Sequence, residues 1–190
     1  WNTGVSLSRH FHLDNQRELA LTLDFYRTSF QDQMVVDLDH NVSEVNIYNL
    51  KGESYSNSFQ VDLTGEIFKS FDMTLAYRYN DVKMDYLDGN MEQAFSNKNK
   101  ALFTTSYKTR FDKWKFDYTV QYNGAKRLPD TSENPEEFNM DPYSPAYFMH
   151  YAQITKKFNK KFAKQFGENI VITTIKDQYY NMKEKVEPVK

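Results

Sequence analysis

Two histidines, His10 and His12, lie two positions apart near the start of the chain. In an extended strand this spacing puts both imidazoles on one face, where they could ligate a metal ion. A metal site needs further ligands, and no metal-binding motif of the sequence supplies them. We therefore interpret both histidines as interior or interface side chains, and we predict no metal site.

Catalytic motifs are missing from the sequence. It contains no HExxH, EF-hand loop, P-loop, GxGxxG or Gly-x-Ser-x-Gly pattern. A hydrolase in a membrane barrel could assemble a serine and a histidine from different strands, but nothing here marks such a pair. We predict that the protein is not an enzyme and carries no cofactor.

Charged and polar side chains recur at alternate positions of the expected strands. A buried charge without a partner is costly, so these groups must pair with each other, meet water or contact a polar domain. We predict that one set faces the interior of a barrel or a domain that fills it. This set is Asp62, Asp72, Arg78, Lys115, Asp117 and Gln121.

A second set of candidates belongs to a long polar loop over residues 126–145 and the position just beyond it. The loop opens with two cations and continues with five acidic residues, Asp130, Glu133, Glu136, Glu137 and Asp141. As an extracellular surface it could contact a cation or a solute; a solvated loop without a ligand is the alternative. The candidate ligand residues are Lys126, Arg127, Tyr143 and Tyr147.

Strict alternation predicts the elements that position these residues. Residues 114–122 place aromatic and aliphatic side chains on one side of a strand and polar side chains on the other, and residues 71–80 and 58–67 repeat the pattern. An aromatic-rich apolar face opposite a face with both charge signs is typical of a wall between lipid and a polar interior. We expect lipid contact from Leu21, Leu23, Phe59, Leu63, Leu75, Tyr77, Phe116, Tyr118 and Val120.

Composition narrows the class of protein. Aromatic residues make up 16% of the 190 residues, and the mean hydropathy is -0.78. No stretch approaches the roughly 18 apolar residues of a transmembrane helix, whereas a membrane barrel needs only alternate apolar residues. The net charge of -2 gives no electrostatic support for a nucleic-acid partner. Without cysteine there is no disulfide or thiolate site.

The predicted strands alternate with short turns at one rim and long loops at the other. Short turns are expected at 14–18, 69–70, 110–113 and 159–161, and long polar segments at 40–56, 81–100 and 124–145. The strands are 3–13, 19–39, 57–68, 71–86, 99–110, 113–124, 146–158 and an eighth after Lys161, with 34–39 projecting beyond the membrane. This asymmetry is typical of outer-membrane barrels.

Seven short segments occur in a particular order: Leu-Asp-Phe-Tyr-Arg-Thr at 23–28, Tyr-Asn-Leu-Lys-Gly at 48–52, Ser-Tyr-Ser-Asn-Ser-Phe at 54–59, Leu-Ala-Tyr-Arg at 75–78, Arg-Leu-Pro at 127–129, Tyr-Ser-Pro-Ala-Tyr at 143–147 and Gly-Glu-Asn at 167–169. In this order and spacing they resemble the C-terminal half of the barrel of TonB-dependent outer-membrane receptors. The resemblance covers about residues 1–170, and we expect a charged tail, atypical of the family, over 171–190.

The resemblance implies an all-β, antiparallel up-and-down meander that forms part of a large transmembrane β-barrel of about 22 strands. It also implies a plug domain, the TonB complex, outer-membrane lipid of a Gram-negative bacterium and a scarce large solute: a ferric siderophore, haem, cobalamin or a glycan. The chain supplies about eight strands and no plug. No signal peptide opens the chain, so we expect either a mature chain or a piece cut from a longer one.

Two alternatives remain open. A complete eight-stranded outer-membrane barrel would fit this length and would act as an adhesin or anchor, or rarely as a lipid enzyme. A soluble β-sheet binding module would instead pack its aromatic face against another sheet.

Overall fold

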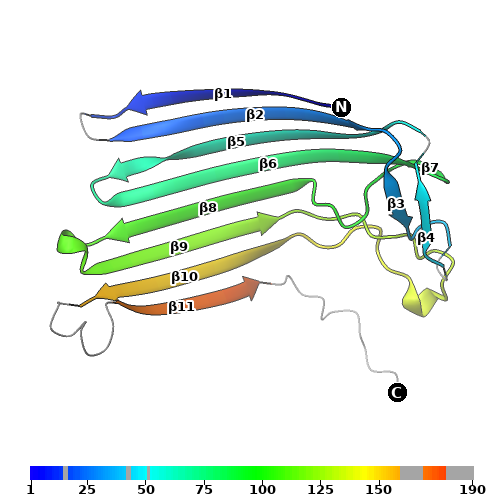
Figure 1. Ribbon diagram of the computed structural model, residues 1–190. Coiled ribbons are helices and arrows are strands. Elements are labelled where there is room, and N and C mark those ends of the chain that lie inside the picture. Colours follow the sequence, from blue (N-terminus) through cyan, green and yellow to red (C-terminus); the bar gives the residue numbers. More distant parts are fainter. Residues whose placement is uncertain (15–16, 42–43, 51, 159–168, 179–190) are drawn as a thin grey trace, which may run out of the picture.

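Alternation of apolar and polar residues produces strands along most of the chain, and these strands join into one antiparallel sheet (Figure 1). The computed structural model describes residues 1–14, 17–41, 44–50, 52–158 and 169–178. The sheet order is β1-β2-β5-β6-β8-β9-β10-β11, with β7 paired to β6. The bounds are β1 Asn2–His12, β2 Glu18–Phe30, β5 Ser54–Phe68, β6 Phe71–Tyr86, β7 Gly89–Glu92, β8 Asn99–Lys108, β9 Trp114–Asn123, β10 Tyr147–Lys157 and β11 Asn169–Gln178.

The prediction of an all-β, antiparallel meander is confirmed, because consecutive strands of the sheet pair side by side. Helical structure in the described residues is confined to two 3-10 turns, η1 Arg110–Asp112 and η2 Glu136–Phe138. None of the helices in this part of the chain is long and apolar enough to cross a membrane.

The register sorts side chains into two faces. One row crosses the sheet from Leu7 through Leu23, Val61, Tyr77, Ala101 and Tyr122 to Phe148. Residues directly opposite in antiparallel strands point to the same side, so this row and its neighbours form what we call the apolar face. All nine residues expected to contact lipid lie on it. The polar face, on the other side, carries Asp62, Arg78 and Gln121.

The part of the chain that the structure describes leaves the apolar face uncovered. Leu7 is 63% exposed, Leu75 45% and Phe116 41%. Over the middle of the sheet the described residues form a single layer (Figure 1). The accessible surface is 14385 Å², whereas a globular monomer of 22.6 kDa would have about 9,500 Å². The described residues therefore provide no second layer over the sheet, such as a β-sandwich would require.

Short turns and long loops lie at opposite ends of the sheet, as predicted (Figure 1). The turn between β5 and β6 places Ser70 at φ 63°, and the turn between β8 and β9 places Phe111 at φ 65°. These left-handed conformations reverse the chain within a few residues. The predicted turn at 159–161 lies outside the described residues.

The predicted strand over 19–39 is wrong beyond residue 30. β2 ends at Phe30, and Asp32 adopts a left-handed conformation with φ 53°, which turns the chain out of the sheet. Residues Met34–Asp37 then form β3, which pairs with β4, Asn46–Asn49, in a separate two-stranded sheet. β4 lies within the predicted loop 40–56, and β7 lies within the predicted loop 81–100.

The expected tail also needs correction. β11 pairs with β10 from Phe148↔Gln178 to Lys157↔Asn169, so residues 171–178 belong to the sheet. The predicted boundary after residue 170 falls inside this strand, because backbone pairing continues across it. Residues 179–190 of the expected tail lie outside the described residues.

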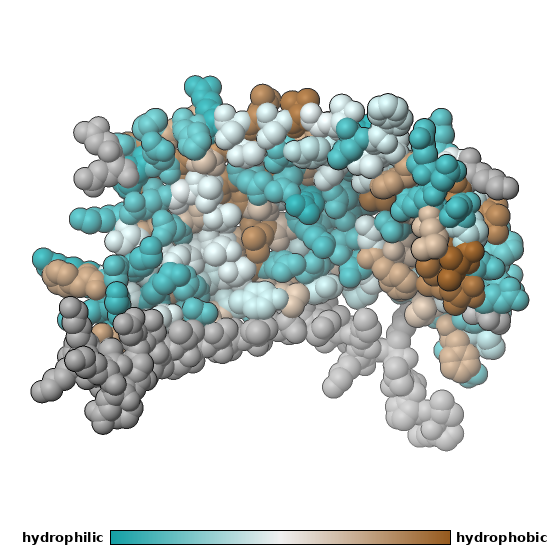
Figure 2. Space-filling model, viewed as in Figure 1, coloured by the Kyte–Doolittle hydropathy of each residue, from teal (hydrophilic) through white to brown (hydrophobic). Residues whose placement is uncertain are grey.

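A small core closes the end of the sheet that carries the long loops, which we call the loop end. Val35, Leu50, Met84 and Tyr86 are buried there, with Tyr48, Val82 and Met91 packed against them. Alternation along β6 points Met84 and Tyr86 to the same side as Arg78. The β3–β4 hairpin therefore folds over the polar face. Figure 2 shows a strongly hydrophobic patch over this hairpin, where Val36 and Ile47 are exposed.

The two edges of the sheet generate a prediction. In the described residues β1 pairs only with β2 and β11 only with β10, so the sheet is open. Open edges and an uncovered apolar face promote association in water. We expect the 190-residue chain to aggregate without detergent and to show strand-rich circular dichroism in detergent micelles. A water-soluble monomer with a sharp thermal transition would contradict this expectation.

Candidate functional site

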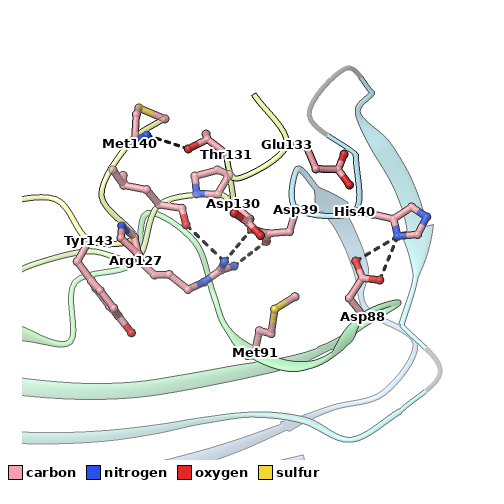
Figure 3. Close-up of a pocket in the computed structure, with 13 residues that line it drawn as sticks. Asp39, His40, Asp88, Met91, Arg127, Asp130, Thr131, Glu133, Met140 and Tyr143 are labelled. Atoms are coloured by element: carbon pink, nitrogen blue, oxygen red, sulfur yellow. Dashed lines mark hydrogen bonds and ion pairs between the residues drawn. The ribbon is translucent and has the colours of Figure 1, made fainter. Parts of the chain in front are cut away.

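A cavity of about 520 Å³ opens at the loop end (Figure 3). Three loops supply its walls: residues after β3, the β6–β7 turn and the segment that follows β9. Its lining combines charged groups with methionine, proline and tyrosine, and includes Asp39, His40, Asp88, Met91, Arg127, Asp130, Glu133, Met140 and Tyr143.

An ion pair between Arg127 and Asp39 joins two of these loops across 88 residues of sequence. Arg127 Nη1 donates to Asp39 Oδ1 at 2.8 Å and Nη2 donates to Oδ2 at 2.7 Å. Its Nε donates to the carbonyl of Glu92 at 2.6 Å, which adds β7 to the connection. The two side chains are 13% and 6% exposed. This two-point pairing is the strong form of the interaction between arginine and carboxylate.

Opposing effects set the pKa of Asp39. Burial by itself raises it, but hydrogen bonds from Arg127 and from the amide of Asp130, at 2.9 Å, outweigh burial. The pKa of Asp39 therefore lies below its ordinary value of 3.8. The hydrogen bond to Asp39 in turn raises the pKa of Arg127. Both groups are ionised at neutral pH.

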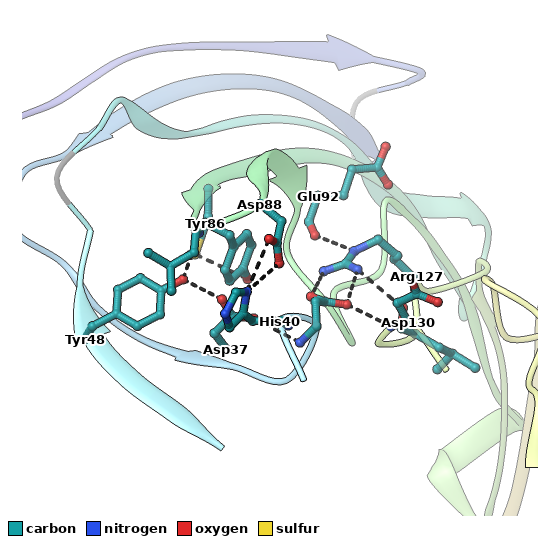
Figure 4. Close-up of polar contacts among 12 residues, drawn as sticks. Asp37, His40, Tyr48, Tyr86, Asp88, Glu92, Arg127 and Asp130 are labelled. Atoms are coloured by element: carbon teal, nitrogen blue, oxygen red, sulfur yellow. Dashed lines mark hydrogen bonds and ion pairs between the residues drawn. The ribbon is translucent and has the colours of Figure 1, made fainter. Parts of the chain in front are cut away.

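A second polar network lies beside the first (Figure 4). Asp37 is fully buried and accepts a hydrogen bond from the Tyr48 hydroxyl at 2.5 Å and another from the Asp39 amide at 2.9 Å. The amide of Leu87 donates to the Tyr48 hydroxyl at 3.1 Å. Burial and the bond to Asp37 raise the pKa of Tyr48 to about 12, so the phenol keeps its proton and acts as a donor.

His40 extends this network to the rim of the cavity. Its Nδ1 lies 3.1 Å from Asp88 Oδ2, which connects the loop after β3 with the β6–β7 turn. Both side chains are about half exposed. The pair therefore contributes little to stability by itself.

The predicted interior residues all lie on the polar face, in two groups. Asp62, Arg78 and Gln121 line a hollow of about 320 Å³ together with Gln60 and Lys100. Arg78 Nε donates to Gln60 Oε1 at 2.7 Å, and Gln60 Nε2 donates to Asp62 at 2.6 Å. The hollow thus carries both charge signs and an intact hydrogen-bond chain.

The other three predicted residues lie nearer the short turns. Asp72 is 3.6 Å from Lys108 Nζ, and Lys115 Nζ is 2.8 Å from Asp117 Oδ1. Asp117 Oδ2 and Ser106 Oγ are buried, and neither has a hydrogen-bond partner in the described residues. These two residues stand opposite each other on β8 and β9. Buried polar atoms usually form hydrogen bonds with a protein group or with ordered water.

The four predicted loop residues do not share one place. Arg127 and Tyr143 pair as an isolated β-bridge and both line the loop-end cavity. The Lys126 amide donates to the Ser144 hydroxyl and its carbonyl accepts from the Ser144 amide, while Tyr147 begins β10 opposite Asn123. Neither lines the cavity. Ligand contact by these residues stays a prediction.

Sequence reasoning missed the acids that organise the loop end. Asp37 and Asp39 follow the apolar run Met34–Val36 and belong to a segment expected to project beyond the membrane. An acid that ends a short apolar run, with a second acid two residues further on, is the signal that could have marked a buried polar contact there. His10 and His12, by comparison, lie beside Glu18, with His12 Nε2 at 2.7 Å. No cluster of three or more possible metal ligands occurs in the described residues.

Comparison with known proteins shows a similarity of fold to one receptor and a similarity of sequence to peptidase T. No family model matches the chain. The structure is similar to the ferric-catecholate import receptor Fiu from K12 E. coli in its closed form, with a TM-score of 0.56 and 13% identity. The match covers 84% of this chain and 21% of that receptor. The likeness supports the coarser part of the predicted resemblance, a β fold like that of this receptor.

The likeness in sequence is to peptidase T. The chain is 32% identical to the Bacillus licheniformis protein over 78 residues, which are 39% of this chain and 19% of that protein. For Lysinibacillus sphaericus the identity is 49% over 43 residues, 10% of that protein. The chain spans about a fifth or less of every relative named here.

The ion pair at the loop end generates a second prediction. Replacing Arg127 with methionine leaves the buried carboxylate of Asp39 unpaired, which should lower the free energy of local unfolding by about 3–5 kcal/mol. The double variant Asp39→Leu with Arg127→Met removes both charges and should be less destabilised than Arg127→Met alone. Hydrogen exchange of the amides of β7 and residues 126–131 measures both. Equal protection of these amides against exchange in the wild type and in Arg127→Met would show that the ion pair between Arg127 and Asp39 does not stabilise the loop end.

The depressed pKa of Asp39 generates a third prediction. A carboxyl group whose pKa is lower in the folded state stabilises that state above its ordinary pKa and loses the contribution as pH falls through the folded value. Loop-end protection against exchange should therefore hold down to about pH 4 and decline below the ordinary value of 3.8. The variant Asp39→Asn should lose this acid dependence. A decline complete by pH 6 would show that another group controls the loops.

Proposed function

We propose that the chain is a section of the wall of a TonB-dependent transporter in the outer membrane of a Gram-negative bacterium. The observation that carries the proposal is the uncovered sheet with an aromatic-rich face on one side and a charged face on the other. Lipid solvates the first face and a polar interior the second, while lateral hydrogen bonds satisfy the backbone. The likeness in fold to Fiu supports the same assignment.

The open sheet favours a section of a larger barrel over a closed eight-stranded barrel. A closed barrel would require β1 to pair with β11, and the described residues of these strands pair only with β2 and β10. A soluble binding module would need a second layer over the apolar face. We infer that further strands extend both edges.

A plug domain is the partner that we propose for the polar face. The hollow at Asp62, Arg78 and Gln121 offers donors and acceptors, and Asp117 and Ser106 have buried polar atoms that need hydrogen-bond partners. The TonB complex would act through that plug.

The solute that we propose is scarce and too large for a porin, such as a ferric siderophore, haem, cobalamin or a glycan. The loop-end cavity with Arg127 and Tyr143 is the candidate surface for first contact. Fiu is described as a ferric-catecholate receptor, which supports a siderophore among these classes.

We propose a transport role without catalysis. The stretch similar to peptidase T amounts to a fifth or less of those proteins, so it does not support a peptidase. Hydrolysis of peptides by the purified chain would overturn this part of the proposal.

Adjacent residues of β6 give a matched test. Leu75 lies on the apolar face between Leu63 and Phe103, and Ala76 lies on the polar face opposite Asp62. Leu75→Arg should cost about 2–4 kcal/mol of stability in lipid bilayers, because the cation would face hydrocarbon. Ala76→Arg should cost much less, because its cation can pair with Asp62. Denaturant titration of both variants in vesicles measures the difference, and equal costs would contradict the proposed orientation.

A further inference from the structure

Cations stacked on aromatic rings gather at one end of the sheet. Of the five such contacts in the described residues, four lie at the ends of β1, β8 and β10 next to the short turns, an end that we call the short-turn rim. They are Arg9 over Phe11 at 5.2 Å, Arg110 over Phe111 at 4.9 Å, and Lys156 over Trp114 and Phe158 at 4.6 and 5.3 Å. The fifth, Arg27 over Tyr55, lies toward the loop end.

The rings of these contacts belong to the apolar face or its turns. Phe11 lies in line with Leu7 on β1, and Trp114 lies in line with Phe116 on β9 and opposite Lys156 on β10. Phe111 is 76% exposed in the β8–β9 turn, and Phe68 is 66% exposed beside the β5–β6 turn. A ring at the edge of an apolar face lies at the depth of lipid headgroups.

The cations at the short-turn rim are available to an anionic partner. Arg9 and Arg110 are exposed, and Lys156 is half-buried against two rings. Lysine and arginine in such positions extend their charge toward the interface while their stems cover apolar surface.

Most acidic side chains near the short-turn rim form hydrogen bonds or ion pairs with other residues. Asp14 pairs with Arg17 at 2.6 Å, and Glu66 accepts a hydrogen bond from the Ser70 amide. Asp72 is on the polar face with Lys108. Asp112 is exposed in the same turn as Arg110. Arg9, Arg110 and Lys156 outnumber Asp112, so the net charge on the apolar side of the rim is positive.

We propose that the short-turn rim binds the headgroups of anionic phospholipids, with Trp114 and Lys156 as its central contact. The aromatic ring fixes the depth of the contact, and the ammonium group above it pairs with the lipid phosphate. Arg9 and Arg110 extend the same chemistry to the neighbouring turns. The inference rests on the proposed membrane location. It adds that the short-turn rim prefers lipids with a negatively charged headgroup.

Trp114 can report this contact directly, because the chain has two tryptophans and the other, Trp1, can be replaced by phenylalanine. The Trp1→Phe chain is reconstituted into vesicles, and its strand content is checked by circular dichroism. Trp114 fluorescence is then measured with phosphatidylglycerol or phosphatidylcholine brominated close to the headgroup. We expect stronger quenching by the brominated phosphatidylglycerol.

Two neighbouring lysines provide a matched pair of variants. Lys156→Gln removes the cation over Trp114 and should lower the preference for phosphatidylglycerol by roughly fivefold, the effect of one cation at an anionic surface. Lys157→Gln removes the same charge one residue further on, where alternation turns the side chain to the polar face, and should leave the preference unchanged.

The outcomes separate the inference from the proposed function. Equal quenching by the two lipids, or an equal loss in Lys156→Gln and Lys157→Gln, would overturn the inference while leaving the membrane location intact. No quenching by either brominated lipid would show that Trp114 lies outside the bilayer, and this would overturn both.

Discussion

A one-layer sheet must satisfy the hydrogen bonds of its backbone within its own plane. Each interior strand forms hydrogen bonds with two neighbours, so the polar backbone needs no contribution from above or below the sheet. The faces remain free to meet different surroundings. The row from Leu7 to Phe148 makes one face apolar, while charged and amide groups, such as Arg78 and Gln60, cover the other. The proposed lipid wall depends on that division.

The loop end is stabilised by a different set of interactions. There the chain leaves the sheet, and the β3–β4 hairpin packs Val35 and Leu50 against Met84 and Tyr86 of β6. Two aspartates, Asp37 and Asp39, are buried in the same place, and each has a specific donor, Tyr48 and Arg127. Buried carboxylates are tolerated only with such donors, which fixes how the three loops meet around the cavity.

The strand pattern could be read from the sequence because alternation is a local property. Residues 71–80 and 114–122 are strands as predicted, and the six interior candidates lie on one face because their parity within each strand is fixed. The strand prediction failed where a single residue changes the direction of the chain. Asp32 turns the chain out of the sheet, so Met34–Asp37 pairs with β4 instead of extending β2. The alternation of Met34–Asp37 is compatible both with pairing to β4 and with an extension of β2.

The class of fold, the division into apolar and polar faces and the asymmetry of turns and loops follow from the amino-acid sequence alone. These depend on side chains two residues apart, a spacing that strand geometry fixes without any distant contact. The contacts of Asp39 with Arg127, of Trp114 with Lys156 and of Arg78 with Gln60 became known only from the folded chain. Each of these contacts depends on strand register or on loop packing between segments far apart in the chain. Composition and periodicity are the same for many registers, so neither can select the partners.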